Sequence, residues 1–201
     1  MKISTKIKRL SVAFTLAGAA LLSGCASSYV DTATKEVPVA QYKKPAQLKP
    51  VKLSFEFQSK GAPNSRATDL LKDQVAEQVN NSGVFTDAAG VPDAGILQVV
   101  LNNVPVEGQN PAAAGFVTGL TFGAVGSSVT DGYVCTISYL APGQSQPVQV
   151  SARHAIHTTL GAASAPVNAE KSPSMEAAVR KMTRDVVSTA LRDLSHSANF
   201  N

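Results

Sequence analysis

The chain has 201 residues, a formal charge of +4 and a pI near 9.1, values that taken alone suggest a polyanionic partner. A composition of 44% hydrophobic and 16% charged residues excludes an intrinsically disordered protein, and two cysteines exclude a disulfide scaffold. The charge excess lies within the first nine residues, which hold four bases and no acid: Lys2, Lys6, Lys8 and Arg9. The rest of the chain has 14 bases and 14 acids, so nucleic-acid binding is not indicated.

Residues 1–24 have the composition of an export signal. The basic stretch is followed by an apolar run, Leu10–Leu22, which is shorter than the roughly 20 residues that a membrane-spanning helix needs. The next residues, Leu22-Ser23-Gly24-Cys25, resemble the lipobox of bacterial lipoproteins, in which cleavage leaves the cysteine as the lipid-bearing first residue. The resemblance implies that Cys25 is acylated. It also implies, because Ala26 rather than Asp follows, an outer-membrane protein facing the periplasm.

The mature chain is expected to hold one domain, residues 51–194, between two less ordered segments. Residues 25–50, rich in Pro, Ser and Thr, are predicted to form a lipidated, mostly extended tether that holds the domain away from the membrane. Residues 195–201 are predicted to be a flexible tail. With Cys25 acylated, Cys135 has no disulfide partner, and we expect a buried free thiol.

The domain shows six predicted elements. Strict alternation of apolar and polar residues predicts a strand over 51–58, and apolar residues on both faces predict a central strand over 95–106. The other predicted elements are strands over 132–140 and 148–160, joined by a turn at 141–144, and helices over 65–82 and 174–194, with Ser65 and Ser174 as caps.

The order β-α-β-β-β-α predicts an α+β fold. We expect a two-layer sandwich with a four-stranded, mostly antiparallel sheet and both helices on one face. In a lipoprotein of this size the order resembles the lipopolysaccharide-assembly lipoprotein that plugs an outer-membrane barrel, and more loosely the small α/β domains of lipoproteins that assist envelope machines. The resemblance covers residues 51–194 as topology alone, so it implies no functional residue.

An uncharged insertion, residues 108–130, separates the second and third predicted strands. Within 111–130 glycine recurs every four residues, a spacing that lets another helix approach closely. Three interpretations stay open: a loop packed on the domain, an apolar flap that docks on a membrane or protein partner, and a segment that enters the membrane in an oligomer. The candidate docking residues are Gly115, Phe116, Gly119, Leu120, Phe122 and Gly123.

The polar residues predict no catalytic, cofactor or metal site. His154 and His157 are three apart on a strand and therefore face opposite sides of the sheet. Asp131, Tyr133 and Arg153 are expected to form an ion pair or cap across the hairpin. The acidic stripe of Asp69, Asp73 and Glu77 is expected to be a solvated helix face, with Arg180 and Arg184 as pairing candidates.

These observations favour a non-catalytic module that binds or assembles with an envelope protein or a lipid-handling complex, anchored to the membrane through Cys25. The alternative is a membrane-inserting oligomer component that uses the Gly-rich segment 111–130, and homo-oligomers fit either case. An enzyme would need a pocket that gathers Asp131, Arg153 and His154.

Overall fold

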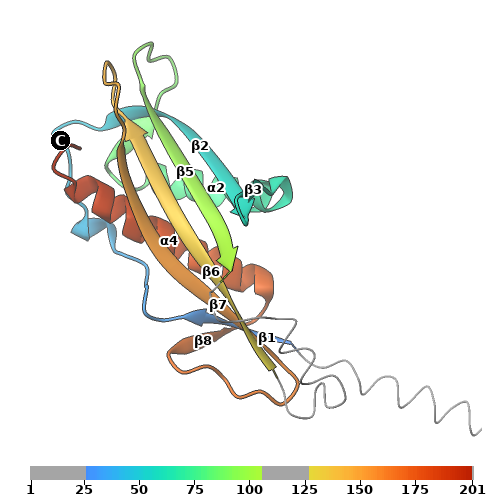
Figure 1. Cartoon of the computed structure of the whole chain (residues 1–201). Coiled ribbons are helices and arrows are strands. Elements are labelled where there is room, and N and C mark those ends of the chain that lie inside the picture. Colours follow the sequence, from blue (N-terminus) through green and yellow to red (C-terminus); the bar gives the residue numbers. More distant parts are fainter. Residues whose placement is uncertain (1–25, 106–126, 201) are drawn as a thin grey trace, which may run out of the picture.

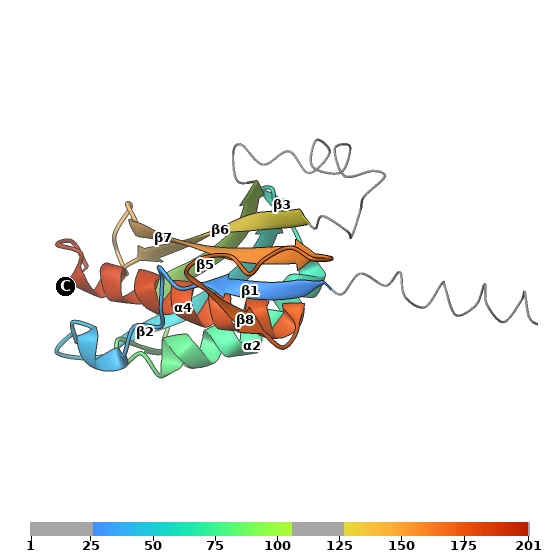
Figure 2. The same cartoon turned by 90° about the horizontal axis from the view of Figure 1, so that it is seen from below.

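The computed structural model describes residues 26–105 and 127–200, which form one curved sheet with two long helices on one of its faces (Figure 1). Seen from below, both helices lie side by side beneath the sheet (Figure 2). The α+β class and the helical layer on one face are confirmed. The elements are β1 (Ser27–Asp31), the 3-10 helix η2 (Val39–Gln41), β2 (Lys49–Ser59), β3 (Ala62–Pro63), α2 (Ser65–Asn80), β4 (Phe85–Asp87), β5 (Gly95–Pro105), β6 (Ser127–Leu140), β7 (Val148–Leu160), β8 (Ala169–Ser172) and α4 (Met175–His196).

Within the described ranges the sheet has eight strands, twice the predicted number. Its order is β3-β2-β5-β6-β7-β1-β8, with β4 also paired to β2. The crossover through α2 makes β2 and β5 parallel, whereas β5, β6, β7, β1 and β8 run antiparallel in succession. The four predicted strands are the four long ones. The four missed strands have two to five residues, too few to show an alternating pattern.

The predicted tether is wrong for its first residues, because Ser27–Asp31 is an internal strand. β1 lies between β7 and β8, and Val30 on it is 1% exposed beneath α4. The chain that follows stays on the domain, since the Val37 and Lys43 N–H groups donate to serine hydroxyls of α4. The sequence did not reveal this because SSYVD is short and the Pro-rich stretch after it lacks any period.

The predicted flexible tail is also wrong at its last described residue. Phe200 is 3% exposed, and its ring centroid lies 5.2 Å from that of Tyr139 and 5.7 Å from that of Phe85. The aromatic cluster closes one end of the core between the sheet and α4. A lone aromatic residue after a polar stretch gives no periodic signal, which is why the sequence suggested fraying.

The core lies between the sheet and the helices, and alternate strand residues point into it. Leu97, Val99 and Leu101 of β5 are fully buried against the helices. Ile96, on the opposite face of the same strand, is 49% exposed. Strand β5 is therefore central in the sheet, as predicted, but its second face is open. The apolar residues on that face do not reflect a second covering layer.

The helix caps differ slightly from those predicted. The side chain of Asn64, not that of Ser65, accepts the N–H of Ala67 at the start of α2. Ser174 caps α4 as expected, because its hydroxyl accepts the N–H of Ala177 at 3.1 Å. Both residue types are favoured at this position because their oxygens satisfy a helix N–H that has no intrahelical partner.

Cys135 is a buried free thiol, as predicted, and burial raises its pKa to about 12. We expect no reaction of this thiol with a disulfide reagent at pH 8 in the folded protein, and full reaction in denaturant, because the thiolate is the reactive form. Thiol titration of Cys25→Ser protein, which leaves one cysteine, measures both rates. Ser145→Cys in the exposed 141–147 turn is the control that should react at once. Rapid labelling of Cys135 without denaturant would contradict the expectation.

Candidate functional site

The residues that the sequence nominates for function lie outside the described residues. They are the acylation candidate Cys25 and the six docking candidates Gly115, Phe116, Gly119, Leu120, Phe122 and Gly123. The described strands nevertheless show where the segment that ends at Cys25 and the segment 106–126 join the domain. Only Ala26 separates Cys25 from β1, and residues 106–126 connect the end of β5 to the start of β6.

Both segments join the domain at the same end of the sheet. In the register of β1, β6 and β7, Ser27 lies opposite Thr159, and Ser127 lies opposite Leu160. Figure 2 shows the starts of β1 and β6 beside the tip of β7, with the C-terminus at the opposite end. The segments of this end contain no Asp, Glu, Lys or Arg, and we call them the uncharged end: residues 26–30, 127–130 and 158–162.

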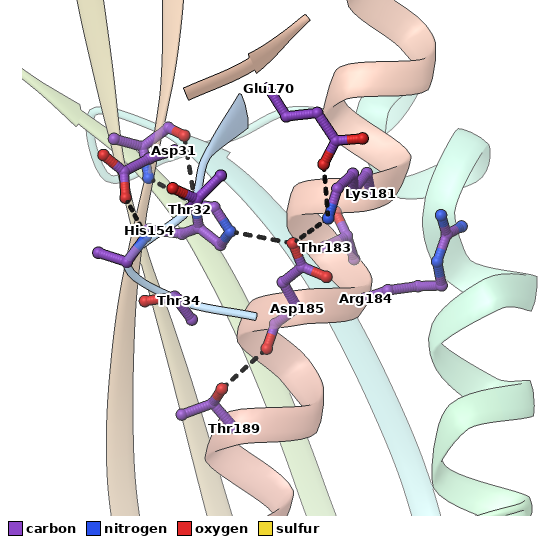
Figure 3. A network of polar contacts seen from close by, with 12 residues as sticks. Asp31, Thr32, Thr34, His154, Glu170, Lys181, Thr183, Arg184, Asp185 and Thr189 are labelled. Atoms are coloured by element: carbon purple, nitrogen blue, oxygen red, sulfur yellow. Dashed lines mark hydrogen bonds and ion pairs between the residues drawn. The ribbon is translucent and has the colours of Figure 1, made fainter. Parts of the chain in front are cut away.

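A buried polar network joins β7 to α4, and the sequence alone had not brought its members together (Figure 3). His154 Nε2 lies 3.3 Å from Asp185 Oδ2, and the two side chains are 0% and 2% exposed. Lys181 Nζ donates to the same Asp185 oxygen at 2.9 Å and lies 4.0 Å from a carboxylate oxygen of Glu170 in β8. The network therefore connects two strands to one turn of the helix.

The donor and acceptor roles in this pair follow from the backbone. The Ala155 N–H donates to His154 Nδ1 at 2.8 Å, so Nε2 carries the ring proton and donates to Asp185. Burial by itself would raise the pKa of Asp185, but the hydrogen bonds from His154 and Lys181 and the positive charge of Lys181 outweigh it and lower the pKa. Asp185 is thus an ionised carboxylate that fixes the imidazole.

The network lacks an available nucleophile. Ser188 lies one turn after Asp185, but its hydroxyl donates to the Asp185 carbonyl and accepts the Val37 N–H, both at 2.9 Å. The Thr189 hydroxyl also donates to the Asp185 carbonyl. We interpret the His154–Asp185–Lys181 network as a structural clamp between sheet and helix.

The constellation that an enzyme would need is not assembled. Asp131 lies opposite Ile156 in the β6–β7 ladder, whereas Arg153 lies opposite Val134. Arg153 is exposed, and its neighbour His154 points to the helical layer. The three residues therefore do not share a pocket.

The other histidines have structural partners. His157 faces the side of the sheet opposite to His154, as predicted, but it is half-buried rather than exposed. It is hydrogen-bonded to Thr130 at 2.9 Å and lies 3.5 Å from Asp31. His196 ends α4, and its ring contacts the Gln41 carbonyl at 3.0 Å. No group of three or more His, Cys, Asp or Glu side chains that could hold a metal occurs in residues 26–105 and 127–200.

A cleft of about 600 Å³ opens between α2, α4 and the segment that contains η2. Its walls carry both signs of charge, from Glu36, Asp73 and Glu77 on one side and Arg180 and Arg184 on the other. The cleft could accept a polar chain, but it holds no arrangement specific to one class of ligand. Burial raises the pKa of Tyr42, which also lines it, to about 12, so this phenol stays a hydrogen-bond donor.

Amides, not ion pairs, join the two helices across this cleft. Gln74 and Gln78 donate to the backbone carbonyls of Arg180 and Arg184 at 2.9 and 3.1 Å. Arg180 instead pairs with Glu176 on its own helix at 2.9 Å. The pairing suggested for the acidic stripe is thus absent from the described ion pairs. The residues of α2 that make the contact, Gln74 and Gln78, do not belong to the predicted acidic stripe.

Comparison with known proteins gives likeness to solved structures alone. No family model matches the chain, and no curated protein matches its sequence. Among solved structures, the rare lipoprotein B of Shewanella oneidensis is similar, with 16% identity and a TM-score of 0.35, over 72% of this chain and 94% of that chain. A likeness of this size carries no argument about function. In the described part of the chain, no helix combines the length and the apolar character needed to span a bilayer.

Proposed function

We propose that the protein is a non-catalytic lipoprotein of the bacterial outer membrane, acylated at Cys25 and facing the periplasm. Its domain binds or helps to assemble an envelope protein or a lipid-handling complex. The observation that carries the proposal is the sequence Leu22-Ser23-Gly24-Cys25 directly after a basic and apolar leader. The small residues fit a narrow protease cleft, and the thiol is the group that accepts the lipid.

Two features of the domain support a binding role: its buried polar pair is structural, and its uncharged insertion lies near the proposed anchor. Its buried histidine and carboxylate are committed to holding α4 on the sheet. The uncharged stretch was predicted as an insertion over 108–130, but its last four residues, 127–130, belong to β6. We propose the remainder, residues 108–126, with Gly115, Phe116, Gly119, Leu120, Phe122 and Gly123, as the docking element; it joins the domain beside the proposed anchor. A long insertion in a small domain is uncommon and often has a function.

Acylation is tested by mass spectrometry of the protein purified from bacterial envelopes. We expect a first residue at Cys25 that carries the mass of three acyl chains, and recovery of the protein in the membrane fraction. The Cys25→Ser protein should keep its leader or be released without lipid, since hydroxyl oxygen does not replace the thiol in this chemistry. An unmodified, soluble wild-type chain would overturn the proposal.

Binding is tested by crosslinking in intact envelopes, comparing the full chain with a chain that lacks residues 112–126. We expect a specific crosslinked partner with the full chain and its loss in the deletion, while the circular dichroism spectrum and melting temperature stay unchanged. Capture of a second copy of the chain alone would favour an oligomer component instead. A domain unfolded by the deletion would show that the segment packs on the core.

A further inference from the structure

The short connection between Cys25 and the domain constrains how the domain sits at a membrane. One residue, Ala26, separates the candidate lipid site from Ser27 of β1, so the backbone between them spans about 7 Å at most. β1 is fixed by pairing on both edges, to β7 and to β8. An acyl chain on Cys25 would therefore hold the start of β1 at the lipid headgroups.

Several strand ends lie next to the start of β1, so more than one strand would face the headgroups. Ser28 lies opposite Ser172 at the end of β8, and Ser127 opposite Leu160 at the end of β7. α4 begins three residues after β8, with Met175 42% exposed. The end of the sheet that would touch the membrane thus comprises β1, β6, β7, β8 and the first turn of α4 (Figure 2).

The chemistry of this surface suits a bilayer. The uncharged end, residues 26–30, 127–130 and 158–162, would give up no solvated charge against the headgroups. Beside it, the exposed Lys171 of β8 lies opposite Tyr29 of β1, and bases are attracted to anionic lipids. Glu176 in the first turn of α4 is 60% exposed, so its carboxylate would stay hydrated among the headgroups.

The opposite end of the sheet is charged. The segments around the start of β2, β4 and the end of α4 carry charges of both signs, on Lys43, Lys44, Lys49, Asp87, Asp93, Arg192 and Asp193. The 141–147 turn between β6 and β7 also lies there. Strand β6 has 14 residues, so about 45 Å separates this turn from the uncharged end.

We propose that the uncharged end lies against the outer-membrane leaflet that holds the lipid of Cys25. The sheet then rises from the membrane, with the 141–147 turn farthest into the periplasm. The inference rests on the proposed acylation of Cys25. It adds an orientation that acylation alone does not dictate, since a long tether would leave the domain free to turn.

Fluorescence quenching in vesicles tests the orientation. The full chain is expressed with its leader, purified with its lipid, and labelled with an environment-sensitive dye at Ala162→Cys. The control is Ser145→Cys in the 141–147 turn, and the native Cys135 is fully buried. The vesicles contain phosphatidylethanolamine, phosphatidylglycerol and a lipid with a nitroxide on its headgroup, a quencher that acts only near contact.

We expect the dye at 162 to lose most of its emission and the dye at 145 to keep it. Mass spectrometry of the same samples establishes whether Cys25 carries lipid. An acylated sample quenched equally at 145 and 162, or more strongly at 145, overturns the orientation and leaves the proposed function standing. A sample that lacks the lipid overturns both, since the orientation depends on the anchor.

Discussion

The Asp185→Ala protein is expected to lose about 1–3 kcal/mol of unfolding free energy, the usual cost of leaving a buried hydrogen-bond donor without its acceptor. Asp185 is 2% exposed and accepts hydrogen bonds from both His154 and Lys181. Without its carboxylate, the fully buried imidazole of His154 keeps an N–H with no acceptor, and Lys181 loses its closest counter-charge. The substitution also removes the side-chain hydrogen bond that joins α4 to β7.

Urea denaturation of the wild-type and variant domains measures this loss. The matched control is Asp193→Ala on the same helix, whose carboxylate is 39% exposed and pairs with Arg192 at the surface. That change should cost at most about 1 kcal/mol, because solvent screens exposed pairs. Equal losses in the two variants would show that the buried network contributes no more than a surface pair.

The same network predicts how stability depends on pH. Because the pKa of Asp185 is lowered in the folded state, its contribution is fully present above the ordinary carboxyl pKa of about 3.9. The contribution is lost as the pH falls through the lowered value, when the folded state must take up the proton. Asp185→Asn removes this titration, so the wild type should lose more stability than the variant between pH 5 and 2.

Replacing Phe200 by alanine is expected to lower the unfolding free energy by about 3 kcal/mol, although the residue is one from the end of the chain. Its ring packs edge-to-face on Tyr139 and Phe85, and Lys49 Nζ lies 5.0 Å from the ring centroid. Removing the ring leaves a cavity between the sheet and α4. Aromatic contacts of this geometry add to the apolar area that is buried.

Thermal unfolding of Phe200→Ala and Asn199→Ala separates this role from a general effect at the terminus. Asn199 is exposed, so its variant should melt like the wild type. A chain that ends at Ser197 should behave like Phe200→Ala. Unchanged melting of Phe200→Ala would restore the expectation of a frayed tail.

The sequence was sufficient for the parts of the fold that repeat a pattern. Apolar patterns over eight or more residues located β2, β5, β6 and β7, and the 3.6-residue period located α2 and α4. The short strands could not be found in this way, because their positions are set by pairing. Tyr29 and Val30 of β1 are buried because β7, β8 and α4 surround them, and those elements lie far along the chain.

The candidate sites also differ in whether their residues are adjacent in sequence or brought together by folding. The residues that resemble a lipobox, Leu22-Ser23-Gly24-Cys25, are adjacent in the chain, so only the sequence can suggest them, and acylation of Cys25 stays a prediction. The contact of His154 with Asp185 joins residues 31 positions apart and depends on how α4 crosses β7. The sequence offered two signals of this contact: a lone histidine in a strand and a lone aspartate on an apolar helix face. Asp185 stands among the buried residues of α4, where a charge needs a partner.

The position of β1 also affects the order in which the sheet can form. Thr32, just after β1, donates to the Asn168 carbonyl, 136 residues farther along, and the strand itself pairs with β7 and β8. β1 can therefore take its place in the sheet only after β7 and β8 have been synthesised. Contacts so distant in sequence slow folding. If Cys25 is acylated as proposed, this delay gives the modifying enzymes time to act before the sheet is complete.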